Sequence, residues 1–383
     1  MERKLAHIEQ ILEINNIPGA DNILCAKILG WECVIAKKDN FKVKDKVIYI
    51  EVDSVVPDKP EFEFLRDRKF RVKTIKLRGQ ISQGLILPLP KDWIVKRQDR
   101  CRIGSDITEE LGITKYLSPS EQSELQREEE KIKLEKNRLK KFLMRYSWFR
   151  KLFLTRKQKN GFPYWVTKTD EERIQNMPQV LTQFADKEVY VTEKIDYQSG
   201  TWTSKQIPRF QGLLGKLLPL KKTIFVVCSR NFTTNAKDGL YWKIAKRYNL
   251  EQICKENPGI IIQGEQGNVG VQGNKYNLTE PKMWVFNIID SNKNYYYNYF
   301  EMQSFCDKYN LDYVPLIGLG TYTLAEIGNT VKELVEFSKD KSVLADIQRE
   351  GVVIRRIENG KKLLSFKVIN PQFLLNYQDE EES

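Results

Sequence analysis

The segment Val191-Thr192-Glu193-Lys194-Ile195-Asp196 ends a strand candidate that runs from Glu188 to Thr192. In an extended segment, residues two apart face the same way, so the heads of Lys194 and Asp196 can enter one pocket. A lysine is a nucleophile only when its amine is deprotonated, which desolvation or a nearby cation brings about, whereas a lone carboxylate holds the proton. Asp196 is therefore better suited to hold a metal ion, its water or a ribose. Taken alone, the same pattern also describes an ordinary surface ion pair at a strand end.

Around this segment, residues 161–383 mix strand and helix patterns without a regular βαβ alternation, which predicts an α+β domain. The strand candidates are Glu188–Thr192, Thr223–Cys228, Ile260–Gln263, Met283–Ile289 and Val352–Arg356. The helix candidates are Leu240–Tyr248, Tyr299–Tyr309 and Val331–Phe337.

Residues 1–115 contain short strand patterns separated by turns, which predicts a small N-terminal β-barrel of the five-stranded OB type. Phe70 to Leu77 alternates apolar and basic residues before a turn at Arg78-Gly79-Gln80. OB barrels bind nucleic acids on an exposed face, and four cations could make such a face basic: Arg71, Lys73, Lys76 and Arg78. The same cations equally fit the ordinary solvated positions of amphipathic strands.

Between these regions, residues 116–160 predict a charged helical linker or insertion. Ser118-Pro119-Ser120-Glu121 is a typical helix start, and apolar residues then recur every seven positions: Leu125, Ile132, Leu139, Tyr146 and Phe153. A single apolar seam favours packing within the chain or linking two domains over dimerisation, so we expect a monomer. The basic residues of this segment either contact phosphates or form a solvated helix face.

The composition narrows the function classes. Lys and Arg number 63 against 51 Asp and Glu, a net charge of +12, which favours a polyanionic partner such as nucleic acid. A basic protein without such a partner remains the alternative. The single histidine, His7, argues against histidine-dependent triads and metal sites, and we expect it to be structural or on the surface. Six cysteines without a C-x-x-C pair, no signal peptide and no apolar run long enough for a membrane indicate a reduced, cytoplasmic protein.

Six short blocks then occur in the order typical of one superfamily. The chain resembles the covalent nucleotidyltransferases, which include ATP-dependent ligases and RNA capping enzymes. The blocks are Glu193-Lys194-Ile195-Asp196, Ser229-Arg230-Asn231, Gly264-Glu265, Trp284-Val285-Phe286-Asn287-Ile288, Glu350-Gly351-Val352-Val353-Ile354-Arg355 and Ser365-Phe366-Lys367. The stretch from Gln266 to Tyr276 resembles RNA ligases in particular.

The resemblance implies a role for each block. Lys194 is expected to take AMP from ATP, with Asp196 and Lys367 as further catalytic residues. The residues expected to bind the nucleotide are Glu193, Arg230, Glu265, Phe286, Glu350 and Lys367. Three carboxylates, Asp196, Glu265 and Glu350, are expected to hold Mg²⁺ or Mn²⁺. Because all six blocks follow residue 161, this half is expected to form the adduct alone.

The chain departs from the superfamily pattern at two positions. Tyr197 stands where a glycine usually follows the aspartate, and Ser365 stands where the final block usually has a first lysine. The first change reshapes the loop after the nucleophile. The second alters how phosphates are held, and Lys361 or Lys362 can compensate.

The N-terminal region carries a second resemblance, because residues 15–21 and 77–85 are similar to the leading OB domain of RNA ligase family 5. The combined resemblance implies an ATP-dependent RNA ligase that joins a 5′-phosphate end to a 3′-hydroxyl RNA end, at nicks in a duplex. From charge and domain order, we expect the barrel to hold the duplex. Two alternatives remain. One is a capping-type guanylyltransferase, which uses GTP, and the other is a non-catalytic nucleic-acid-binding protein, suggested by Tyr197 and Ser365.

Overall fold

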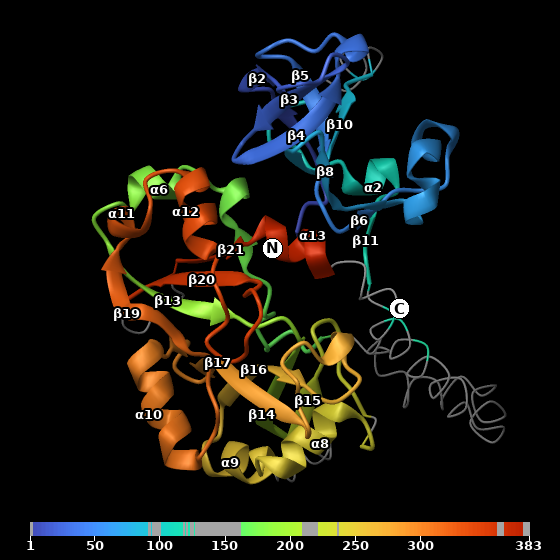
Figure 1. Ribbon diagram of the computed structural model, residues 1–383. Coiled ribbons are helices and arrows are strands. Elements are labelled where there is room, and N and C mark those ends of the chain that lie inside the picture. The colour runs from blue at the N-terminus through green and yellow to red at the C-terminus, as the bar shows by residue number, and fades with distance from the viewer. Residues whose placement is uncertain are drawn as a thin grey trace, which may run out of the picture.

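The computed structural model describes residues 3–90, 101–117, 162–208, 221–235, 237–357 and 364–377, with a few single residues between these ranges. The described chain forms an N-terminal lobe, residues 3–117, and a larger C-terminal lobe, residues 162–377 (Figure 1). The predicted linker helix and its basic residues lie outside the described residues, as do Lys361 and Lys362.

The N-terminal lobe is rich in short strands. They are β1 (Ala6–Gln10), β2 (Glu13–Asn16), β3 (Ile23–Ile28), β4 (Trp31–Ala36), β5 (Lys46–Ile50), β6 (Ser54–Val55), β7 (Arg71–Val72), β8 (Thr74–Leu77), β9 (Gln80–Gln83), β10 (Leu85–Pro88) and β11 (Thr114–Lys115). Helical turns η1 (Lys37–Asp39) and η2 (Pro60–Arg68) and helix α2 (Thr108–Leu111) connect them.

These strands form four small sheets, β1-β5-β10, β2-β3-β4, β11-β6-β7 and β8-β9. The predicted OB-type strands are therefore present, but in the described residues they do not close into one barrel. Residues with a positive φ interrupt the strand pairing at turns, for example Asp53 after β5 and Gly84 between β9 and β10. Gly84 has φ +108°, and a Cβ there would lie 2.4 Å from the Tyr49 ring, so only glycine fits this bend.

The C-terminal lobe contains two five-stranded sheets. The first has the order β12-β21-β20-β13-β19, formed by β12 (Glu172–Arg173), β13 (Glu188–Lys194), β19 (Leu316–Thr323), β20 (Gly351–Arg356) and β21 (Ser365–Ile369). The second has the order β15-β14-β16-β17-β18, formed by β14 (Gln198–Pro208), β15 (Lys221–Cys228), β16 (Ile260–Gly267), β17 (Lys282–Asp290) and β18 (Tyr295–Tyr296). The chain therefore passes from one sheet to the other between Lys194 and Gln198.

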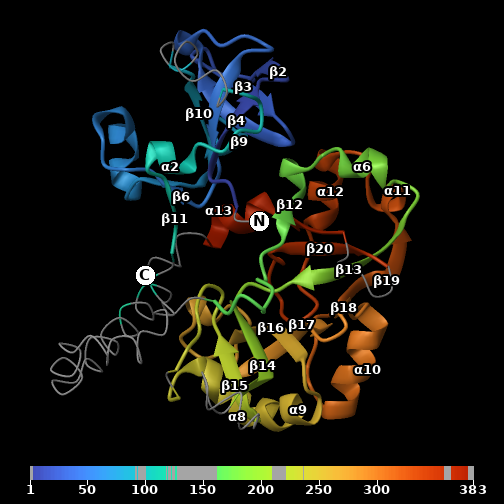
Figure 2. The ribbon, with the colours of Figure 1, turned by 180° about the vertical axis from the view of Figure 1, so that it is seen from behind.

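Helices cover the outer face of each sheet (Figures 1 and 2). Helices α6 (Val180–Gln183), α11 (Leu324–Ile327) and α12 (Val331–Ser338) share a core with the first sheet, built around Val191, Ile354 and Phe366. Helices α8 (Leu240–Arg247), α9 (Leu250–Glu256) and α10 (Tyr299–Tyr309) share a larger core with the second sheet, around Trp202 and Ile262. Turns η3 (Ile174–Asn176) and η4 (Gln272–Asn274) and helix α13 (Pro371–Tyr377) complete the lobe.

Most elements predicted from periodicity are present. The helix Tyr299–Tyr309 begins where predicted because Asn298 and Glu301 form a capping box, and it ends where predicted at Asn310, which has a left-handed backbone. The five predicted strands are present, and β14, β19 and β21 join them without having been predicted, which confirms the α+β class. Within the described residues, no helix is long and apolar enough to cross a membrane.

The two lobes contact each other through the turn η3. Gly30 N donates to Gln175 O at 2.8 Å, and Trp31 Nε1 donates to Asn176 Oδ1 at 2.5 Å. Asn176 Nδ2 in turn donates to Glu51 Oε1 at 2.6 Å. Helix α13 lies against β8, so the last described element also touches the N-terminal lobe (Figure 1). These contacts dock the N-terminal lobe beside the point where β13 ends.

Candidate active site

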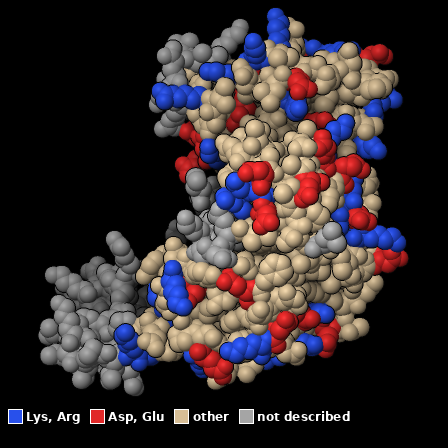
Figure 3. All heavy atoms as spheres, turned by 90° about the vertical axis from the view of Figure 1, so that its left-hand side faces the viewer, with Lys and Arg blue, Asp and Glu red and all other residues tan. Residues whose placement is uncertain are grey.

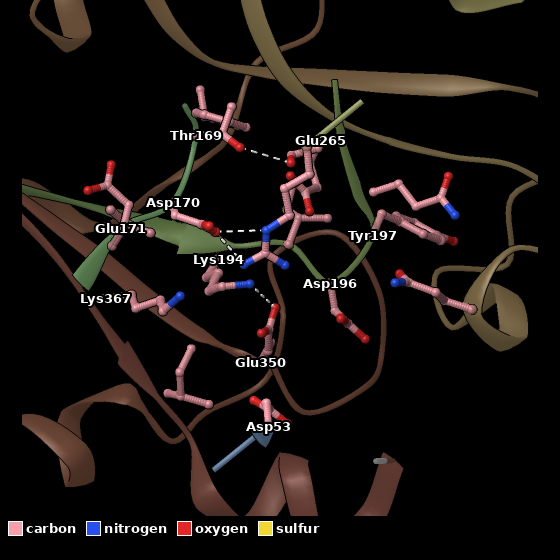
Figure 4. A pocket seen from close by; sticks show the side chains of 18 of the residues that line it. Asp53, Thr169, Asp170, Glu171, Lys194, Asp196, Tyr197, Glu265, Glu350 and Lys367 are labelled. Atoms are coloured by element: carbon pink, nitrogen blue, oxygen red, sulfur yellow. Dashed lines mark hydrogen bonds and ion pairs between the residues drawn. The ribbon is translucent and has the colours of Figure 1, made fainter. Parts of the chain in front are cut away.

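One cavity collects the residues of all six sequence blocks (Figure 4). It lies where β13 of the first sheet gives way to β14 of the second. Its lining includes every residue predicted to act on the nucleotide: Glu193, Lys194, Asp196, Arg230, Glu265, Phe286, Glu350 and Lys367. Non-local strand pairing thus brings together side chains that are more than 170 positions apart in the sequence.

Strand register explains these positions. Lys194 pairs with Gly351 across β13 and β20, which places Glu350 beside the lysine. Val353 pairs with Lys367 across β20 and β21, and Arg173 pairs with Lys367 across the parallel strands β12 and β21. Glu265 and Phe286 approach from the second sheet, on β16 and β17.

Lys194 is held by a carboxylate. Its Nζ donates to Glu350 Oε2 at 2.5 Å. Burial favours the neutral amine, but Glu350, Glu265 and Asp196 outweigh it and raise the pKa of Lys194. The lysine is therefore an ammonium in this arrangement, and it can attack only after positive charge has offset the surrounding carboxylates.

The pKa values of the neighbouring carboxyl groups favour the binding of a cation. Burial, reinforced by Glu350 and Asp196, raises the pKa of Glu265 to about 8 against the opposing effect of Lys194 and Arg230. Burial likewise raises the pKa of Glu350. Carboxyl groups that ionise with difficulty in a buried site gain most from a bound divalent cation.

The three expected metal ligands do not form a ready-made cage. Among the described residues, no group of three or more His, Cys, Asp or Glu side chains is close enough to hold a metal ion. The physical reason is that lysines take two of the carboxylates, since Lys194 binds Glu350 and Lys275 binds Asp196. A cation would have to displace at least one of these ammonium groups.

A cluster of cations lines the same cavity. Burial, together with Arg173 and Arg230, lowers the pKa of Lys367 to about 7, against the opposing effect of Asp170. Arg173 is buried, and its Nε and Nη1 have no hydrogen-bond partner within the described residues. Asp170 accepts from Arg230 Nε at 2.7 Å and lies 3.5 Å from Lys115 Nζ. Closely spaced cations with unsatisfied donors match a polyphosphate.

Phe286 and Glu193 occupy different parts of the lining. Phe286 is half-buried, and its carbonyl accepts from Arg355 Nη1 at 2.6 Å, which fixes the strand that carries the ring. The Glu193 carboxylate is buried and accepts from Ser342 Oγ at 2.5 Å and from Val343 N at 2.7 Å. Glu193 thus anchors the 342–343 loop to the nucleophile strand, while Phe286 has an aromatic face to offer a base.

The N-terminal lobe also lines the cavity, which the sequence did not predict. Its contributors are Arg3, Asp53, Arg71, Lys115 and Tyr116. Asp53 accepts from Arg71 and Arg173, each at 3.0 Å, so one carboxylate joins the two lobes. That residues 161–383 form the adduct alone stays a prediction, although this ionic network includes residues of both lobes.

The four cations predicted to form one basic face differ in exposure. Arg71 is buried, and its guanidinium lies 3.5 Å from the centre of the Tyr116 ring. Lys73 is half-buried, whereas Lys76 and Arg78 are exposed on the β8–β9 hairpin. The alternating pattern predicted an exposed Arg71, but the ion pair with Asp53 holds its side chain in the interior. On the face shown in Figure 3, basic and acidic residues intermix over both lobes.

His7 is structural, one of the two roles expected of it. The ring is buried, with Nδ1 2.8 Å from Glu9 and Nε2 3.5 Å from Glu51. Burial opposes protonation, but Glu51 and Glu9 prevail and raise the pKa of His7 to about 9.

The sequence did not predict a role in the site for four residues that line the cavity: Asp170, Arg173, Lys275 and Arg355. Lys275 lies in the block that resembles RNA ligases, but no role was assigned to it. Arg355 ends another block, and its Nε donates to Ser365 Oγ at 3.1 Å, at the position where the superfamily usually has a lysine. Asp170 and Arg173 carry no local signal, because only the strand pairing of β12 brings them to the cavity.

A half-buried lysine beside carboxylates, a cluster of cations in the same cavity and an aromatic ring on a neighbouring strand define a covalent nucleotidyltransferase. The comparisons with known proteins agree. Residues 187–369 match the family model of RNA ligase, and residues 5–89 match that of an OB-fold domain. Residues 187–369 therefore form an RNA ligase domain, residues 5–89 form an OB-fold domain, and the protein is an RNA ligase enzyme.

Solved structures extend this match over the whole chain. The Naegleria gruberi RNA ligase with PPi is 27% identical, with a TM-score of 0.74, and the match covers 99% of this chain and 100% of that chain. A variant of that ligase with ATP and Mn is 26% identical, with a TM-score of 0.74, covering 98% and 100%. Another variant, with AMP and Mn, is 26% identical, with a TM-score of 0.73 and the same coverage. No curated protein sequence matches the chain.

Proposed function

We propose that this protein is an ATP-dependent RNA ligase that forms a covalent lysyl-AMP intermediate at Lys194. The observation that carries the proposal is the placement of Lys194 between the carboxylates Glu265 and Glu350 and the cations Lys367, Arg173 and Arg230. The whole-chain likeness to a ligase solved with ATP and Mn supports the choice of nucleotide and metal.

The residues divide the work of the first step. Lys194 Nζ, once unprotonated, attacks the α-phosphorus of ATP, so a P–N bond forms as the bond to pyrophosphate breaks. Lys367, Arg173 and Arg230 stabilise the charge that develops on the departing phosphates. Phe286 stacks on adenine. Asp196, Glu265 and Glu350 would hold Mg²⁺ or Mn²⁺, which would offset their negative charge beside Lys194.

The later steps use the same cavity. An oxygen of the RNA 5′-phosphate attacks the AMP phosphorus, and the Lys194 amine leaves. The 3′-hydroxyl then attacks the 5′-phosphate, and AMP leaves, which joins the two ends at a nick in a duplex. We propose three parts of the chain: an OB domain at 1–115, a helical linker at 116–160 and a nucleotidyltransferase domain at 161–383.

We further propose that the enzyme repairs RNA as a monomer in the cytoplasm. All six cysteines are buried free thiols, which suits a reducing compartment. The guanylyltransferase alternative is less well supported, because the family match and the N-terminal position of the OB domain both favour a ligase.

The test is covalent labelling. The full-length protein, incubated with Mn²⁺ and α-labelled ATP, should become labelled, and GTP should not label it. Lys194→Ala should remain unlabelled yet still seal a nick whose 5′ end already carries AMP, because that step needs no lysyl adduct. Lys187→Ala, at an exposed lysine just before β13, serves as the control and should label normally. Labelled Lys194→Ala protein would exclude this nucleophile.

A further inference from the structure

A second lysine is buried beside the nucleophile segment. Lys275 Nζ donates to Asp196 Oδ2 at 2.5 Å, and the two side chains are 4% and 11% exposed. Lys275 lies directly after η4, so the pair joins the segment that carries the nucleophile to the loop that follows β16. Burying a lysine costs free energy unless an anion neutralises its charge, so the buried Lys275 ammonium needs a carboxylate such as that of Asp196.

Helix α13 covers the other side of the Lys275 ammonium. The Nζ atom lies 5.3 Å from the centre of the Phe373 ring and 5.4 Å from that of Tyr377. Two aromatic faces and one carboxylate therefore confine the ammonium. Because α13 also packs on β8, the N-terminal lobe supports the helix that holds Lys275.

The neighbours of Lys275 fasten the same loop to the same segment. Tyr197 Oη donates to Asn274 Oδ1 at 3.1 Å, and Tyr276 Oη accepts from Asp196 N at 3.3 Å. The Tyr197 ring stacks on Trp284, with ring centres 6.1 Å apart. Three consecutive residues, 274 to 276, thus each bind Asp196 or Tyr197, which leaves the Asp196 carboxylate little freedom to turn.

We propose that Lys275 is a positioning residue for nucleotidyl transfer, holding the Asp196 carboxylate in place and away from Lys194. The inference rests on the proposed function of Lys194. Asp196 lies two residues from Lys194 in the same cavity, and its charge acts on that lysine. Without Lys275, the carboxylate can turn to the Lys194 ammonium, which would then be held by two carboxylates instead of one and could not approach the α-phosphorus.

The experiment measures the rate of adenylylation of the full-length protein against ATP concentration, at saturating Mn²⁺. Lys275→Met keeps the length and apolar stem but removes the charge, and should lower kcat roughly 10- to 100-fold. KM for ATP should stay close to that of the wild type, because the phosphates and the base are held by other residues. Lys275→Arg should restore most of kcat, since a guanidinium also pairs with a carboxylate and lies on aromatic rings.

Lys282→Met is the matched control. Lys282 also has a carboxylate partner, Asp312 at 3.5 Å, and an aromatic one, the Trp284 ring at 5.4 Å, but it is 38% exposed and does not line the cavity. Its kcat should be unchanged. Thermal unfolding of each variant shows whether it is still folded. Recovery of kcat in Lys275→Arg then distinguishes a loss of positioning from a loss of general stability.

Two outcomes overturn the inference: wild-type kcat in Lys275→Met, or an arginine variant that is folded but no faster than the methionine variant. Failure of the wild-type protein to label at Lys194 would instead refute the proposed function itself.

Discussion

Asp53 of the N-terminal lobe and Arg173 of the C-terminal lobe form an ion pair, with Oδ2 and Nη2 3.0 Å apart, at the rim of the cavity that holds Lys194. Burial disfavours the charged carboxylate, but Arg173 and Arg71 outweigh burial and hold the pKa of Asp53 well below its usual range. The OB-fold lobe therefore determines where an active-site cation stands, in addition to any contact that it makes with RNA.

Asp53→Ala should weaken both stability and adenylylation. The change leaves Arg71 and Arg173 buried without their shared anion, at a cost of about 1–3 kcal/mol in the free energy of unfolding. A misplaced Arg173 should also raise KM for ATP. Denaturant unfolding and ATP labelling measure the two effects. Asp58→Ala, which breaks an exposed pair with Arg66, is the control, and an equal effect there would contradict the assignment.

The carboxylates predict a metal requirement. Glu265→Ala and Glu350→Ala should each lower adenylylation roughly 10- to 100-fold, because a divalent cation loses a ligand or the partner that orients one. Chelation of Mn²⁺ should abolish labelling of the wild-type protein, and Mn²⁺ added back should restore it. Glu256→Ala, on the surface of α9, should label normally. Near-normal labelling by both active-site variants would show that these carboxylates are dispensable for this step.

Lys367 predicts a pH-dependent cost. The pKa of Lys367 in the folded protein is about 7, below the usual 10.5. Between pH 7 and 10.5, Lys367 is therefore mostly neutral in the folded protein but still protonated in the unfolded chain. The contribution of this lysine to stability therefore rises with pH across that window and is least favourable below pH 7. Lys367→Met should raise Tm at pH 6 by roughly 2–4 °C, with a smaller gain at pH 9. Calorimetry at both pH values checks this, with Lys222→Met as an exposed control.

Tyr197 and Gly267 should be coupled. A Cβ on Gly267 would lie 2.6 Å from the Tyr197 ring, so Gly267→Ala should destabilise the protein and slow adenylylation. Tyr197→Gly removes the obstacle, and the alanine should be tolerated in that background. Unfolding of both single variants and the double variant should give a coupling free energy of about 1–2 kcal/mol. Additive effects would mean that the two residues do not clash.

Lys76 and Arg78 remain the candidates for phosphate contact on the N-terminal lobe. Replacing both with alanine should weaken binding to nicked duplex RNA and lower the log–log slope of affinity against salt by about one per lost contact. Adenylylation should be unaffected, because neither residue lines the cavity. Binding at several salt concentrations measures the slope. An unchanged slope would remove the hairpin from the RNA interface.

Many of the residues that line the cavity were predictable because their sequence signals are local. Lys194 and Asp196 are two residues apart on an extended segment, and the order of Arg230, Glu265, Phe286, Glu350 and Lys367 along the chain matches a known pattern. The helix Tyr299–Tyr309 was predictable for the same reason, since its periodicity and its capping residues lie within the helix or next to it. Short-range patterns of this kind determine which elements form and which side chains carry reactive groups.

The ion-pair partner of each charged residue was not predictable, because it depends on which strands become neighbours in the fold. Arg173 meets Lys367 only because β12 pairs with β21, and it meets Asp53 only because the lobes dock. Arg71 has the sequence pattern of a solvated strand residue, yet an ion pair buries it. Lys275 reaches Asp196 from 79 positions away through the fold of one loop. Charges interact through space, so the residues present are set by the sequence, whereas their pairing and protonation are set by the tertiary structure.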